Sequence, residues 1–153
     1  MSLIWEHKRI GECSAEDVLA FCKLRTDVFF LEQQITEEEI DAFDSDPATD
    51  HIWCSDDQVP VGYVRVVRQQ PAPQDDFGIE TSIGRLVVHA DYRRRGIARE
   101  LMERALQACG LVDVILHAQT YIQDFYQDCG FEPVGEVFEE AGIAHIRMVR
   151  RAP

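Results

Sequence analysis

Three consecutive arginines followed by a glycine stand out in a chain of 153 residues whose formal net charge is -13. They occupy positions 93–96, between an apolar segment that reads LVV and a helix-like segment that begins at Ile97. Where a strand gives way to a helix, several backbone N–H groups point to one place, and the helix dipole adds roughly half a positive charge there. Such a turn binds anions, most often phosphate. Gly96 removes a Cβ that would hinder close approach, and four side chains can add bidentate contacts: Arg93, Arg94, Arg95 and Arg99.

Other catalytic and binding patterns are missing from the sequence. It contains neither the GxxxxGK[ST] pattern of a nucleotide P-loop nor the GxGxxG dinucleotide fingerprint. The GxSxG pattern of a serine hydrolase and the HExxH pattern of a zinc peptidase are absent too. Five widely spaced cysteines form no CxxC pair, so we expect no disulfide framework and no metal site.

Hydrophobic periodicity predicts the elements that would position the arginine turn. Alternating or continuous apolar runs indicate strands, and apolar residues three and four apart indicate helices. Ser14 with Asp17, and Thr36 with Glu39, match the pattern of a helix N-terminus. We expect strands over 4–8, 51–55, 59–68, 79–89, 112–118, 131–138 and 143–150, and helices over 14–33, 36–44, 97–109 and 122–129. This order predicts one α+β domain that spans residues 1–153, with a mixed sheet and helices on its faces.

The turn itself carries a family resemblance. Residues 93–98 read RRRGIA, which resembles the acyl-CoA pyrophosphate loop, Q/R-x-x-G-x-G/A, of the GNAT superfamily of N-acetyltransferases. Residues 125–131, FYQDCGF, resemble the family's helix-to-strand segment, in which a tyrosine is followed four residues later by Gly-Phe. The resemblance implies the GNAT fold, a central mixed and mostly antiparallel sheet flanked by helices on both faces.

The likeness is greater still to the ElaA-like branch of that superfamily. Four segments match it: LRTDVFFLEQ at 24–33, EIDAFD at 39–44, HAQ at 117–119 and EEAGIAHIRM at 139–148. One departure is visible, because Val88 is followed by His89 and Ala90 where many members have a proline. That difference affects the exit from the strand and leaves the phosphate loop untouched.

The resemblance implies an enzyme that moves an acetyl group from acetyl-CoA to a primary amine by direct attack in a ternary complex. The backbone amides of residues 94–99 would hold the pyrophosphate, and the edge of the strand at 86–88 would pair with the pantetheine amides. Tyr126 would act as general acid toward the leaving thiolate. The residues expected to bind the co-substrate are Leu86, Val87, Val88, Arg93, Arg94, Arg95, Gly96, Ile97, Ala98, Arg99, Gln119 and Tyr126.

The general base remains open in the sequence. An acceptor amine is protonated near neutral pH and must lose a proton before it attacks, either to a side chain or through water to the solvent. Glu32, His117 and His145 are the candidates expected to border the acceptor, and His51 is a further candidate base. Cys129 is expected in the core, so an acetyl-cysteine relay is not favoured.

The charge distribution bears on the partners. Residues 1–80 contain 18 acidic and 6 basic side chains, whereas residues 81–153 contain 10 and 9. Nucleic acid is therefore not expected, because phosphate backbones require a broad basic face. An acidic acceptor cleft would favour a cationic amine, such as a polyamine, an aminoglycoside-like amine or a lysine side chain. An acidic surface is also a common solubility feature.

Two rival hypotheses have other consequences. A non-catalytic acyl-CoA-binding or sensing module would keep the loop without the chemistry. An interaction protein would use both motifs only for packing. The absence of a long apolar run and of a signal-like N-terminus predicts a cytoplasmic protein with no membrane partner, and both a monomer and a homodimer remain open.

Overall fold

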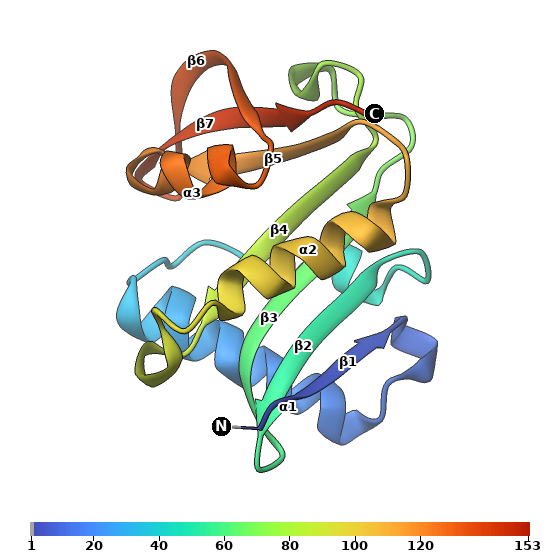
Figure 1. The fold of residues 1–153 in the computed structure, drawn as a ribbon, viewed down its shortest axis with the longest axis vertical. Coiled ribbons are helices and arrows are strands. Elements are labelled where there is room, and N and C mark those ends of the chain that lie inside the picture. The colour runs from blue at the N-terminus through green and yellow to red at the C-terminus, as the bar shows by residue number, and fades with distance from the viewer. Residues whose placement is uncertain (1) are drawn as a thin grey trace.

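A computed structural model describes residues 2–153 of the chain. A seven-stranded sheet with the order β1-β2-β3-β4-β5-β7-β6 runs through the molecule (Figure 1). Its strands are β1 Ile4–Lys8, β2 Asp50–Asp56, β3 Val59–Arg68, β4 Thr81–Val88, β5 Val114–Gln119, β6 Glu132–Glu140 and β7 Ile143–Arg150. All neighbours are antiparallel except β4 and β5, which are parallel. The expected mixed, mostly antiparallel sheet is confirmed.

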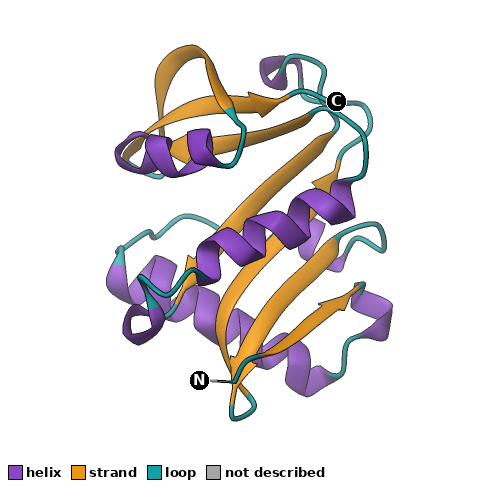
Figure 2. Cartoon of the chain, viewed as in Figure 1, coloured by secondary structure: helices purple, strands orange, loops and turns teal. Residues whose placement is uncertain are grey.

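Helices cover both faces of the sheet, as Figure 2 shows. Helix α1, Ala15–Thr26, packs through Phe21 and Leu24 against one face, whereas α2, Ile97–Cys109, packs against the other. Neighbouring strand residues divide between these two cores, as period-2 alternation requires. At Gly62 of β3 a Cβ would lie 2.9 Å from Ile97, so glycine permits the close approach of α2. The third helix, α3, spans Gln123–Asp128 beside β5 and β6.

The first helix follows its sequence signals. The Ser14 hydroxyl accepts the Asp17 N–H at 3.0 Å, and the Asp17 carboxylate accepts the Ser14 N–H at 3.0 Å, which is a complete capping box. After Thr26 the chain continues as a π-helical segment over Asp27–Glu32. Together the two segments span most of the predicted helix. No helix within residues 2–153 is both long and apolar enough to cross a membrane.

The predicted second helix, over residues 36–44, is wrong. Only a 3₁₀ turn forms there, at Ala42–Ser45. The carboxylates of Glu39, Asp41 and Asp44 bind arginines of the core, whereas Glu37 and Glu38 are exposed. Because those ion pairs fix an irregular path, the tertiary contacts override the local capping pattern.

The parallel pair opens the sheet. β4 and β5 pair only at their first residues, where Thr81 lies opposite Val114 and Ser82 lies opposite Ile115. Beyond Ser82 the two strands diverge toward their C-terminal ends (Figure 1). A bulge at Arg85, whose φ is 56°, also separates β4 from regular pairing with β3. The C-terminal half of β4 therefore has a free edge on the side of β5.

Candidate functional site

The arginine turn has the geometry of an anion site. Gly96 is the N-cap residue of α2 and adopts a φ of 80°, while Arg94 before it also has a positive φ of 63°. No side chain caps this helix. The N–H groups of its first turn therefore point outward without an intrahelical partner. Within residues 2–153, no atom lies within 4 Å of the position that a Cβ on Gly96 would occupy. The left-handed backbone conformation, and not crowding, therefore favours glycine there.

A cavity of about 530 Å³ lies along this turn and the free edge of β4. Most of its wall is apolar, and arginines surround the end at the turn. Nine of the predicted co-substrate residues line it: Leu86, Val87, Val88, Arg93, Arg94, Gly96, Ile97, Ala98 and Arg99. An extended ligand with an anionic end and an amide-containing arm fits this combination of free strand edge and helix N-terminus.

The arginines of the turn have different environments. Arg93 donates to the Val88 carbonyl at 2.9 Å and to both Glu32 carboxylate oxygens at 2.6 and 2.8 Å. The bond from Arg93 lowers the pKa of Glu32. Arg93 therefore ties the turn to the π-helical segment. The Arg95 guanidinium lies 5.2 Å from the centre of the Tyr92 ring.

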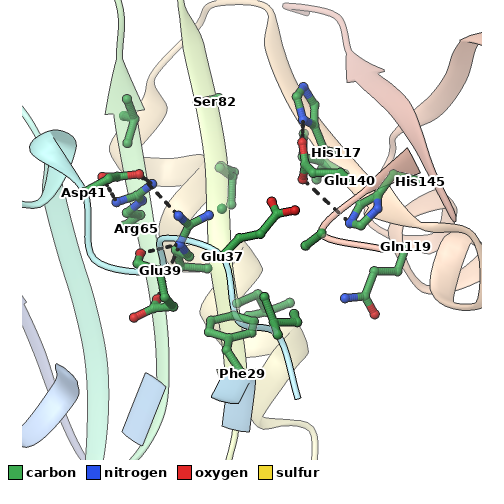
Figure 3. Close-up of a pocket in the computed structure, with 18 of the residues that line it drawn as sticks. Phe29, Glu37, Glu39, Asp41, Arg65, Ser82, His117, Gln119, Glu140 and His145 are labelled. Atoms are coloured by element: carbon green, nitrogen blue, oxygen red, sulfur yellow. Dashed lines mark hydrogen bonds and ion pairs between the residues drawn. The ribbon is translucent and has the colours of Figure 1, made fainter. Parts of the chain in front are cut away.

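A second cavity, of about 470 Å³, lies where β4 and β5 diverge (Figure 3). The two cavities share four lining residues, which are Gln33, Leu86, Tyr121 and Ile122. Four further predicted residues line this second cavity: His117, Gln119, Tyr126 and His145. Glu32, expected near the acceptor, lines only the cavity of the turn. His51 lines neither cavity.

Tyr126 is held in place by aromatic packing. Its ring is 8% exposed and meets Phe125 and Phe131 in edge-to-face contacts with centroids 5.2 and 6.4 Å apart. Burial raises the pKa of Tyr126, so the hydroxyl keeps its proton at neutral pH. We find no hydrogen bond to that hydroxyl from residues 2–153. The hydroxyl proton therefore has no acceptor within residues 2–153, and Tyr126 lines the cavity.

Two histidines and one glutamate form a cluster on the wall made by β5, β6 and β7. His117 contacts the Glu140 carboxylate through Nδ1 at 3.0 Å and the Asp76 carboxylate through Nε2 at 2.8 Å. Burial alone would lower the pKa of His117, but the two carboxylates outweigh it and raise the pKa. His145 lies 3.7 Å from Glu140 (Figure 3). The bond from His117 lowers the pKa of Glu140.

The opposite wall is an acidic segment anchored by buried arginines. Arg25 is fully buried and donates to Asp44 at 2.7 and 3.0 Å and to Glu39 at 2.7 Å. Arg65 donates to Asp41 at 2.7 and 2.9 Å. Burial would raise the pKa of Asp44, yet the Arg25 bonds bring it down to about 2. Beside this network, Glu37 and Glu38 line the cavity with exposed carboxylates.

Known proteins match the chain over nearly its full length. Residues 11–152 match the description "Acetyltransferase (GNAT) domain". The chain belongs to the GNAT family. Protein ElaA of Escherichia coli is 35% identical over 152 residues, which cover 95% of each chain. The resemblance to the ElaA-like branch is therefore confirmed.

Solved structures agree with this assignment. An acyl-CoA N-acyltransferase from Pseudomonas aeruginosa has 35% identity and a TM-score of 0.86, over 97% of this chain and 99% of that one. Escherichia coli ElaA has 31% identity and a TM-score of 0.87, over 98% and 100%. The chain is thus a member of an acyltransferase family with acyl-CoA as co-substrate.

Several residues that line the cavity between β4 and β5 were not predicted from the sequence. Glu140 and Asp76 lie in a hairpin and a loop far from both motifs, and both contact His117 in the cavity. Arg65 and Arg85 looked like ordinary strand residues. One signal was available for them, because charged residues inside otherwise apolar strands are rarely buried unless they are paired.

Proposed function

We propose that the protein is an acyl-CoA-dependent N-acetyltransferase that acts on a primary amine with cationic character. The observation that carries this proposal is the meeting of two cavities at the bulged strand β4. One contains the anion-binding turn, and the other contains Tyr126 and ionisable side chains. Acetyl-CoA entering along β4 would present its thioester where the cavities join, and an amine would approach from the second cavity.

Each protein group has a definite role in this mechanism. The N–H groups at the start of α2 would bind the pyrophosphate, and the free edge of β4 would hold the pantetheine arm. Fixing both substrates in one geometry removes much of the entropic barrier to a bimolecular reaction. Tyr126 would then protonate the thiolate as the tetrahedral intermediate collapses.

Direct attack is supported over an acyl-cysteine intermediate. None of the five cysteines lines either cavity. Cys129 is half-buried beside Tyr126, and burial raises the pKa of its thiol, which disfavours the nucleophilic thiolate.

The charges in the second cavity favour a cationic acceptor. The carboxylates of Glu39 and Asp41 are paired with arginines, so they contribute little free charge. Glu37 and Glu38 have no ion pair with residues 2–153 and leave the entrance acidic. An amine panel tests this preference: equal turnover of acidic and cationic amines would contradict it.

The first experiment is calorimetric titration of acetyl-CoA and longer acyl-CoAs into wild type and an Arg94→Glu/Arg95→Glu variant. We expect binding to wild type and at least ~100-fold weaker binding to the variant, because Arg94 lines the cavity and the two substitutions together change the charge of the turn by four units. Absence of binding to wild type would refute the proposal. A stronger response to a longer acyl-CoA would redefine the transferred group.

Tyr126→Phe separates an enzyme from a non-catalytic acyl-CoA-binding module. It removes the proton donor and keeps the ring, so we expect turnover to fall by about 10²–10³-fold with an unchanged Kd for acetyl-CoA. Phe131→Leu, which alters packing against the Tyr126 ring at a residue that lines neither cavity, is the matched control. No turnover by wild type with any amine of the panel, despite tight binding, would favour the sensing module.

A further inference from the structure

The four candidate bases differ in whether they carry a lone pair that can accept a proton from an amine in the cavity. Glu32 is bonded through both carboxylate oxygens to Arg93. His51 is fully buried, with Nδ1 2.6 Å from the Tyr63 hydroxyl and Nε2 3.1 Å from the Asp44 carbonyl. Neither lies in the cavity between β4 and β5. Both groups have structural partners, and neither borders the cavity proposed for the acceptor.

His117 reaches the cavity but cannot accept a proton there. Both of its ring nitrogens lie against carboxylate oxygens, at 3.0 Å from Glu140 and 2.8 Å from Asp76. Ionised carboxylates only accept hydrogen bonds, so both nitrogens must donate. His117 is therefore a bound imidazolium that neutralises two carboxylates, with Arg147 adding a bond of 2.9 Å to Asp76.

His145 is arranged differently. Its Nδ1 lies 2.7 Å from the Ile143 carbonyl oxygen, which accepts only, so Nδ1 carries the hydrogen when the ring is neutral. Nε2 then bears the lone pair. Nε2 makes no hydrogen bond within residues 2–153, and the Glu140 oxygen 3.7 Å away is beyond hydrogen-bond length. The side chain is only 8% exposed and lines the cavity.

The position of His145 suits a reaction at the diverging strands. On β7 it pairs directly with Gln119, the last residue of β5. His117 lies two residues before Gln119, so all three side chains occupy one face of the sheet, and all three line the cavity that also contains Tyr126. Figure 3 shows His117, Glu140 and His145 as one group above Gln119.

We propose that His145 is the general base that deprotonates the acceptor amine, with its tautomer fixed by the Ile143 carbonyl and the Glu140 carboxylate 3.7 Å from its Nε2. This inference rests on the proposed acyl transfer and adds to it a residue for the proton. Glu140 and His117 are positioning residues, since His117 holds the Glu140 carboxylate beside His145.

The protons balance in the proposed step. An ammonium R–NH₃⁺ gives one proton to His145 Nε2, and the freed amine lone pair forms a bond to the thioester carbon. The C–S bond breaks as the intermediate collapses, and Tyr126 gives its hydroxyl proton to the thiolate. The second proton lost from nitrogen restores the Tyr126 hydroxyl, and His145 returns its proton to water.

His145→Asn tests the inference with two kinds of acceptor. Asparagine keeps an N–H near the place of Nδ1, so it can still bond the Ile143 carbonyl, but it lacks the basic nitrogen. An alkylamine is protonated at pH 7.5, whereas a hydrazide-type amine is already neutral. We expect about a 10²–10³-fold loss of kcat/KM with the alkylamine and less than about fivefold with the neutral amine.

The control is His7→Asn, which removes a histidine on β1 that lies 2.8 Å from an Asp50 oxygen and lines neither cavity. It should leave both rates within about twofold. Added imidazole should partly restore alkylamine turnover to His145→Asn. Equal losses with both amines, or no loss with either, would overturn the base assignment while wild-type turnover still supports acyl transfer. Wild type inactive with both amines would instead remove the proposed function.

A second readout does not depend on turnover. Histidine ¹⁵N spectra of the free protein should show the hydrogen of neutral His145 on Nδ1 and two bound hydrogens on His117. Calorimetry should give His145→Asn an unchanged Kd for acetyl-CoA. A neutral His145 with its hydrogen on Nε2 would contradict the mechanism, because no lone pair would then face the cavity.

Discussion

The two cavities are built in opposite ways. The one at the arginine turn takes most of its wall from residues 86–99, a single stretch of chain. The one between β4 and β5 draws on the segment after α1, β3, β4, β5, the Asp76 loop and the β6–β7 hairpin. Backbone groups and one helix end define the first. Side chains that neutralise one another define the second.

Because of this difference, the two cavities should respond differently to substitutions. A turn made of main-chain N–H groups tolerates side-chain variation, provided that the glycine and the helix start remain. A wall made of paired charges changes when any partner changes, because an unpaired buried charge is costly. We therefore expect co-substrate binding to survive substitutions that damage the acceptor cavity.

The largest effect should come from the buried arginine network. Asp44→Asn leaves Arg25 buried without its main carboxylate and weakens Arg65 as well, so we expect a loss of about 3–5 kcal/mol in the free energy of unfolding in urea. Asp57→Asn, in the exposed β2–β3 turn, should cost less than about 0.5 kcal/mol.

Binding of acetyl-CoA by the Asp44→Asn variant tests whether the two cavities depend on different contacts. Folded Asp44→Asn should bind acetyl-CoA with the wild-type Kd while turning over amines poorly, since members of the network line the cavity between β4 and β5 and none lines the cavity at the turn. A parallel loss of acetyl-CoA affinity would show that the two cavities depend on the same contacts.

Acid pH should produce the next largest effect. The pKa of Asp44 is lowered from 3.8 to about 2, so its stabilising contribution is present above pH 4 and is lost as the pH falls through 2. The difference in unfolding free energy between wild type and Asp44→Asn should therefore shrink by about 2 kcal/mol between pH 6 and pH 2. A constant difference would mean that the carboxylate is not ionised in the folded protein.

The stability that His117 contributes should depend on pH with the opposite sign to that of Asp44. Its pKa is raised, so the stability that it contributes is present below its ordinary pKa of 6.5 and is lost as the pH rises through its folded value. The stabilities of wild type and His117→Asn should therefore converge at alkaline pH.

The same contrast explains which parts of the fold and of the candidate site could be predicted from the sequence. The turn was predictable because its chemistry is contiguous, from the strand end through Gly96 to the start of α2. The strand and helix order followed from periodicity in the same way. The helix predicted over residues 36–44 is wrong because carboxylates of that segment bind Arg25, Arg65 and Arg85, which lie on three separate elements. Glu140 could not be found, because nothing local distinguishes it from the other acids of the hairpin.

A smaller effect is expected on the turn side. Gly96 has a φ of 80°, so Gly96→Ala should cost about 1 kcal/mol of stability. Acetyl-CoA affinity should fall as well, because the strained turn reorients its N–H groups, while the acceptor wall is unaffected. Gly11→Ala, at a site with open space and no positive φ, is the matched control and should be neutral. Unchanged affinity in Gly96→Ala would argue that arginine side chains, and not the backbone, hold the ligand.

The smallest effect concerns the acidic entrance. Glu37→Gln and Glu38→Gln remove exposed charges, so each should raise KM for a cationic amine by about two- to fourfold at low salt. The increase should disappear near 0.5 M salt and be absent for a neutral amine of similar shape, because screening removes only the charge effect. Glu16→Gln, an exposed acid in the first turn of α1, controls for a change in total charge. A KM change that persists at high salt would mean that Glu37 or Glu38 contacts the amine directly, and the acceptor cavity would then extend to a specific carboxylate at its entrance.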